Sequence, residues 1–70
     1  MTSQREEMPL GLEMKFGAYP EAMHTFSCMS VEEQNRVISY VKGAQTGPDA
    51  MNRVNEVIRN LNHSQTNFLS

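Results

Sequence analysis

The sequence predicts an all-α fold, a small bundle of four short helices that ends in an αα-hairpin. Apolar residues recur at intervals of three and four through most of the chain, which is the spacing of one face of an α-helix. No segment alternates apolar and polar residues over more than a few positions, so strands are not indicated. Residues that start and stop helices divide the periodic stretch into four segments.

The first expected helix spans residues 9–18, and the second spans residues 20–28. Pro9 suits the first turn of a helix, where its missing N–H removes no hydrogen bond. Pro20 ends the first helix, because proline disfavours helical backbone in the residue before it. Pro20 then opens the second helix, and Glu21 lies favourably near the positive end of that helix dipole.

The third and fourth expected helices, residues 31–43 and 48–61, form the hairpin. The third begins at a capping box, in which the Ser30 hydroxyl accepts from the Glu33 N–H and the Glu33 carboxylate accepts from the Ser30 N–H. The fourth has two possible starts: Thr46 caps it with its hydroxyl, or Gly47 caps it and Pro48 takes the first helical position.

Seventy residues allow one domain, and a chain of this size buries only about 60% of the surface that it exposes when unfolded. We expect a flexible lead-in over residues 1–8, a helical domain over residues 9–62 and a flexible tail over residues 63–70. One apolar face of each helix should contribute to a common core. Its expected members are Leu10, Met14, Met23, Phe26, Val37, Ile38, Val41, Val54, Val57, Ile58 and Leu61.

Composition and charge argue against several classes of protein. The chain has six basic and eight acidic residues, a net charge of −2, and this balance argues against nucleic-acid binding. Cys28 is the single cysteine, so we expect neither a disulfide nor a metal site. The first residues lack a signal-peptide pattern, and no apolar stretch is long enough to cross a membrane, so a cytoplasmic protein is expected.

No set of residues has the pattern of a catalytic site. His24 and Cys28, four residues apart, form the one enzyme-like pair, but no third group accompanies them. Glu32 and Glu33 are adjacent and point about 100° apart on a helix, so they cannot act on one bond. We therefore expect no enzymatic activity and no cofactor.

The hairpin also has the outline of a helix-turn-helix, which makes nucleic-acid binding the alternative interpretation. Asp49 and Glu56 share the outer surface of the last helix, and the turn is looser than the usual three or four residues. The candidate DNA contacts are Asn52, Arg53, Asn55 and Arg59.

A non-catalytic protein-interaction or regulatory module is the favoured interpretation. The chain has six methionines, whose flexible thioethers suit adaptable binding surfaces and also fill gaps in small cores. Four short helices cannot hide every apolar residue of the first helix, and we expect no concave pocket in so small a domain, so one face of that helix should dock another protein or a second copy. The expected contact residues are Leu12, Phe16 and Tyr19.

The stretch from Met8 to Ile38 resembles a group of short uncharacterised helical proteins of Firmicutes, and it departs from their pattern at Leu12, Glu13 and Tyr19. The matching positions are Pro9, Leu10, Gly11, Met14, Pro20, Glu21, Ala22, Met23, Phe26, Ser30, Glu32, Glu33 and Gln34. This resemblance implies a small helical protein of bacterial origin.

The second half, from Phe26 to Ile58, is similar to the C-terminal helical segment of the YdeI/OmdA-type bacteriocin-protection family. The residues in register are Tyr40, Ala44, Thr46, Arg53 and Val54. That family has a cluster of arginines where this chain has Met51, Asn52 and Arg53. Neither resemblance implies a catalytic residue.

Overall fold

The computed structural model describes residues 7–66, 68 and 69. Within these residues the chain forms four α-helices, and each of their bounds lies within one residue of the prediction. They are α1 Leu10–Ala18, α2 Pro20–Ser27, α3 Val31–Lys42 and α4 Gly47–Asn62. The predicted all-α bundle with a C-terminal hairpin is therefore confirmed. Residues 1–6 of the expected lead-in, and residues 67 and 70 of the expected tail, lie outside the described residues.

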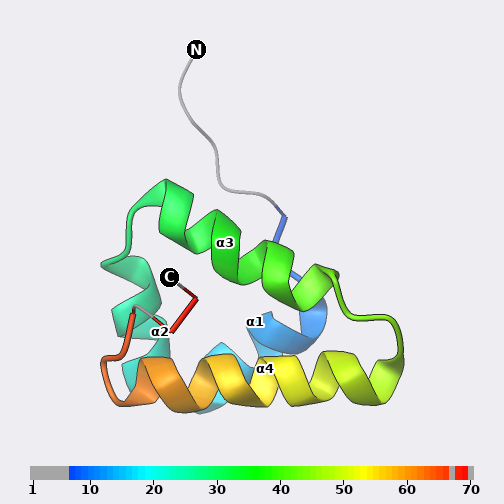
Figure 1. Cartoon of the computed structure of the whole chain (residues 1–70). Coiled ribbons are helices and arrows are strands. Elements are labelled where there is room, and N and C mark those ends of the chain that lie inside the picture. The colour runs from blue at the N-terminus through cyan, green and yellow to red at the C-terminus, as the bar shows by residue number, and fades with distance from the viewer. Residues whose placement is uncertain (1–6, 67, 70) are drawn as a thin grey trace.

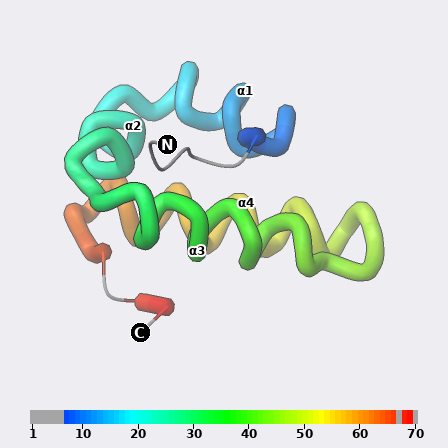
Figure 2. The backbone as a smooth tube through the Cα atoms, turned by 90° about the horizontal axis from the view of Figure 1, so that it is seen from above, coloured from blue at the N-terminus to red at the C-terminus, as the bar shows by residue number. Residues whose placement is uncertain are grey.

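The helices form two layers. α3 and α4 run side by side in opposite directions as one layer (Figure 1). α1 and α2 pack together across one face of this hairpin, as the view from above shows (Figure 2). Phe68 and Leu69 are half-buried against the core, and they lie on the opposite face of the hairpin (Figures 1 and 2).

Local hydrogen bonds fix the helix starts that the sequence predicts. The Ser30 hydroxyl accepts from the Glu33 N–H at 3.2 Å, and the Glu33 carboxylate accepts from the Ser30 N–H at 3.1 Å, so the capping box is formed. The Thr46 hydroxyl accepts from the Asp49 N–H at 3.1 Å, which selects Thr46 as the cap of α4. Tyr19 alone separates α1 from α2, as the last cap of one and the first cap of the other.

Apolar side chains from all four helices meet in one core. At its centre the rings of Phe16 and Phe26 lie 4.9 Å apart between centroids and are tilted by 40°, a favourable geometry for an aromatic pair. The buried apolar residues are Leu12, Phe16, Ala22, Phe26, Val37, Ile38, Val41, Val54, Val57, Ile58 and Leu61.

The rotation of α1 about its axis differs from the prediction. Leu10 and Met14 are 70% and 67% exposed, whereas Leu12 is buried and Phe16 is only 2% exposed. The prediction that Leu10 and Met14 belong to the core was therefore wrong. The prediction that Leu12 and Phe16 lie on an exposed docking face was also wrong. Both faces of α1 are apolar. The buried face is the one that carries the aromatic ring of Phe16.

The inner face of α2 also differs at one position. Met23 was expected in the core but is exposed, and Ala22 is buried in its place. α2 lies against both α1 and α4, and a close approach of helices favours a small side chain between them. Phe26 is buried as predicted.

A buried glutamine connects α3 to the end of α2. The Gln34 side-chain amide donates to the Phe26 carbonyl at 2.8 Å, and Gln34 is the one buried polar residue in the described part of the chain. The Phe26 carbonyl, in the last turn of α2, also accepts from the Met29 N–H at 3.0 Å, so the glutamine amide gives it a second hydrogen bond. The bond from Gln34 also explains how a polar residue can occupy the apolar face of α3.

α4 ends in a hydrogen-bonded reversal of the chain. The Ser64 N–H donates to the Leu61 carbonyl at 3.0 Å, and the Gln65 N–H donates to the Asn60 carbonyl at 2.8 Å. This is the bonding pattern of the Schellman motif. Ser64 takes the left-handed conformation that the motif requires, with φ of 59°. The reversal turns the chain back toward the hairpin.

We predict that Phe16→Ala unfolds most of the protein. Truncating a buried phenylalanine costs about 3–5 kcal/mol, which is as large as the whole stability that a core of this size supplies, about 3–5 kcal/mol. Met14→Ala is the matched control, because Met14 is exposed on the same helix. Circular dichroism during urea denaturation measures both changes. A Phe16→Ala protein as stable as Met14→Ala would contradict the observed rotation of α1.

Candidate functional site

An apolar groove lies between the start of α1 and the N-terminal half of α4. Its volume is about 390 Å³, within the range of small binding sites. The expectation that so small a domain would form no concave pocket was therefore wrong. The residues that line the groove are Pro9, Gly11, Met14, Lys15, Val41, Gly47, Ala50, Met51 and Val54.

The groove results from the unequal lengths of the helices. α4 has 16 residues and α1 has nine, so at 1.5 Å per residue α4 is roughly 10 Å longer than α1. α2 packs near the C-terminal end of α4 (Figure 1), and the turn of the hairpin extends past the start of α1 (Figure 2). The first turns of α4 therefore form one wall of a groove rather than part of the core.

Two glycines deepen the groove. A Cβ atom added at Gly11 or at Gly47 would meet nothing within 4 Å. Neither glycine has a positive φ, so neither close packing nor backbone conformation requires glycine at these positions. Larger side chains there would project into the groove and fill it.

Flexible apolar side chains surround the groove. Met14 and Met51 are both exposed and line it, and Leu10 lies one turn before Met14 on α1. Unbranched thioethers can adjust their rotamers to ligands of different shape. Met14 and Met51 therefore give the groove exposed apolar edges.

Lys15 is the charged residue of the groove lining. It is half-buried. Among the described residues no carboxylate lies within ion-pair distance of its ammonium group. The groove therefore combines an apolar lining with one positive charge that has no partner in the described part of the chain.

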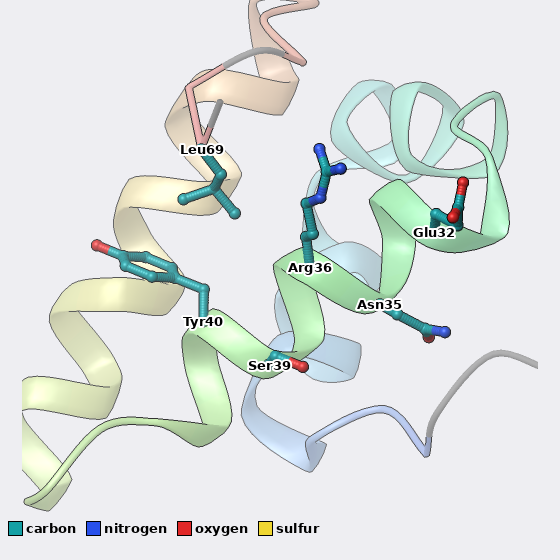
Figure 3. Close-up of a pocket in the computed structure, with 6 residues that line it drawn as sticks. All are labelled: Glu32, Asn35, Arg36, Ser39, Tyr40 and Leu69. Atoms are coloured by element: carbon teal, nitrogen blue, oxygen red, sulfur yellow. The ribbon is translucent and has the colours of Figure 1, made fainter.

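A second hollow, of about 570 Å³, lies over the outer face of α3. Figure 3 shows Arg36 and Tyr40 on the same side of α3 as Leu69, while Asn35 and Ser39 point to another side. Its polar groups do not converge on one point, so this hollow is an open depression of the surface. The residues that line it are Glu32, Asn35, Arg36, Ser39, Tyr40 and Leu69.

A cluster of polar side chains joins α3 to α4. The Tyr40 hydroxyl donates to Glu56 at 2.5 Å, and Arg53 donates to the Tyr40 carbonyl at 2.8 Å. The Arg53 guanidinium lies 4.9 Å from the centre of the Tyr40 ring and 3.4 Å from the Asp49 carboxylate. The hydrogen bond to Glu56, aided by burial, raises the pKa of Tyr40 above its usual value of 10.0.

The four residues of the nucleic-acid alternative have different roles in the structure. Arg53 turns back onto Tyr40 and Asp49, whereas Asn52, Asn55 and Arg59 are exposed. α3 and α4 run alongside each other (Figure 1), unlike the steeply crossed pair of a helix-turn-helix. Nucleic-acid binding stays an untested alternative, and Arg53 contributes to the contact between α3 and α4.

The structure separates the three expected partner-binding residues. Leu12 and Phe16 are in the core, and Tyr19 is exposed. Tyr19 does not line the groove but a separate hollow of about 370 Å³ that it shares with Asn55 and Arg59. Sequence reasoning missed Gly11 and Lys15. The signal for Gly11 that the sequence offered is its position inside an expected helix, where no turn requires a glycine.

The His24–Cys28 pair is present but isolated. The Cys28 Sγ lies 3.9 Å from the His24 Nε2, and both residues are exposed. No group of three or more His, Cys, Asp or Glu side chains that could hold a metal occurs among residues 7–66, 68 and 69. The pair therefore lacks the third group that an activated nucleophile uses.

Comparison with protein-family models, curated proteins and solved structures gives no match for this chain. The resemblances to short Firmicutes proteins and to the YdeI/OmdA-type family stay predictions. No helix in the described part of the chain combines the length and apolar character that crossing a membrane requires.

We predict that Tyr40→Phe lowers the stability of the protein below pH 10 and has less effect above it. The pKa of Tyr40 is raised in the folded state. The stability that the Tyr40 hydroxyl contributes is therefore fully present below the unfolded pKa of about 10, and it is lost as the pH rises through the folded pKa. Urea denaturation of both proteins between about pH 8 and pH 11 measures the difference. A constant difference across that range would contradict the prediction.

We predict no binding to duplex or single-stranded DNA at low salt. Arg53 is held by Tyr40 and Asp49, and the net charge of the chain is −2. Amide NMR signals of residues 49–60 should not shift when DNA is added. Shifts that weaken steeply with salt, and that Arg59→Ala reduces, would instead support the helix-turn-helix interpretation.

Proposed function

We propose that this protein is a small cytoplasmic docking module that binds another protein through the apolar groove between α1 and α4. The observation that supports this proposal is the groove itself, which has a volume of about 390 Å³ and is lined by the exposed residues Met14 and Met51. Gly11 and Gly47 also line it, although a Cβ atom at either position would meet nothing within 4 Å. A cytoplasmic location is supported by Cys28, a free exposed thiol of the kind that reducing compartments preserve.

Two of the five large apolar side chains that are exposed in the described part of the chain line the same groove, and this supports a binding role. Single exposed apolar residues are normal on protein surfaces. Leu10, Met14 and Met51 are more than half exposed, and the last two line one groove. A contiguous apolar patch of this kind typically marks an interaction site. Covering these side chains contributes about 25 cal/mol for each Å² of apolar surface removed from water.

The chemistry of the groove favours a macromolecular ligand over a substrate. Apart from Lys15, its lining presents only apolar side chains and glycines. Small-molecule sites usually add several convergent polar groups that fix the orientation of the ligand. A protein surface can instead supply its own shape and its own apolar anchors.

We predict that Gly11→Leu weakens partner binding at least about tenfold without harming the fold. The new side chain enters the groove from a position with nothing within 4 Å, and it raises helix propensity by several tenths of a kcal/mol up to about 1 kcal/mol. Gly17→Leu is the matched control, because Gly17 also has open space around it and does not line the groove. Thermal unfolding should show both variants at least as stable as the parent.

The binding measurement begins with capture of proteins from cells that make this chain, followed by titration of each captured protein in purified form. A partner should bind the parent and Gly17→Leu with equal affinity, and should bind Gly11→Leu at least about tenfold more weakly, a loss of about 1.4 kcal/mol. Partners that bind Gly11→Leu as tightly as the parent would show that the groove is not the docking site.

A further inference from the structure

We infer that the groove receives an amphipathic helix of the partner protein, which places two large apolar side chains one turn apart in the groove and a carboxylate against Lys15. This inference rests on the proposed docking function. It adds the secondary structure and the charge of the ligand. The dimensions, the walls and the charge of the groove each support it.

The groove has the length of two helical turns. Along α4 its lining runs from Gly47 to Val54, a stretch of eight residues that rises about 10 Å along the helix axis. Side chains at positions i and i+4 of a ligand helix are about 6 Å apart along the axis, so both fit within that length. The volume of the groove is about 390 Å³, within the range of small binding sites.

The walls of the groove favour a helix over an extended peptide. Both walls are helices, α1 and α4, whose interior backbone groups already bond within each helix. No strand occurs among the described residues, so the groove offers no sheet edge to pair with an added strand. An extended ligand would leave backbone groups unpaired against an apolar surface, whereas a helix satisfies its own.

Lys15 determines the charge of the ligand. It is half-buried in the lining and has no carboxylate partner among the described residues. An acidic side chain next to the apolar anchors of the ligand would pair with it, and a basic side chain would be repelled. In a two-fold dimer the same surface of both copies meets, so a second copy joined groove to groove would bring another Lys15 and no carboxylate from its lining. A different protein is therefore the better fit.

The test is selection of displayed random peptides of about 16 residues, enough for roughly four helical turns, on the full chain. Each enriched peptide is synthesised and titrated against the parent, Gly11→Leu, Gly17→Leu and Lys15→Gln. We expect peptides with apolar residues at i and i+4 and an adjacent Asp or Glu, which gain helical circular dichroism on binding. They should bind Gly17→Leu like the parent and Gly11→Leu at least about tenfold more weakly.

A double-mutant cycle tests the ion pair. Replacing the peptide's acidic residue by its amide should weaken binding to the parent by about three- to tenfold, and should have little effect on binding to Lys15→Gln. Equal losses on both proteins would overturn the pairing with Lys15.

Other outcomes separate this inference from the proposed function. If the enriched peptides bind Gly11→Leu more weakly than the parent but lack the acidic residue or gain no helical circular dichroism, the inference is wrong. The proposed docking function would still be supported. If the parent chain forms a dimer in sedimentation and Gly11→Leu does not, the occupant is a second copy and the inference is wrong. If no enriched peptide is sensitive to Gly11→Leu, both the inference and the docking function fail.

Discussion

The packing of Phe16 against Phe26 sets the rotation of α1, and the candidate site depends on that rotation. With the Phe16 ring 4.9 Å from the Phe26 ring, the opposite side of α1 must carry Leu10 and Met14 into solvent. The same rotation turns Gly11 and Lys15 toward α4, where they line the groove. A rotation that buried Met14 instead would place an aromatic ring on the surface and leave the centre of the core without one of its two rings.

The helices could be predicted because their signals are local. The capping box of Ser30 and Glu33 and the proline at position 20 each act on the adjacent turn, and both predicted boundaries hold. The faces of α3 and α4 could also be predicted, since each has one apolar face and one polar face. The burial of Val37, Ile38, Val57 and Leu61 follows from that pattern.

The rotation of α1 and the groove could not be predicted in the same way. α1 is apolar on both sides, so periodicity does not choose between Met14 and Phe16, and a contact with a residue on another helix decides. The groove depends on where a short helix ends over a longer one, which is a tertiary property. Lys15 looked like an ordinary surface lysine, because nothing in its neighbours along the chain reveals that α4 lies beside it.

The junction between α1 and α2 consists of Tyr19 alone, and this limits how the groove can respond to a ligand. The Tyr19 N–H donates to the Lys15 and Phe16 carbonyls, and its own carbonyl accepts from the Met23 N–H. No loop remains that could act as a hinge. Widening the groove by swinging α1 would also move α2, because the Phe16 and Phe26 rings couple the two helices, and α2 is held in turn by its packing on α4 and by the Gln34 side chain of α3. The backbone walls are thus preorganised, so a ligand loses little affinity to reorganisation, and adaptation is left to the methionine side chains.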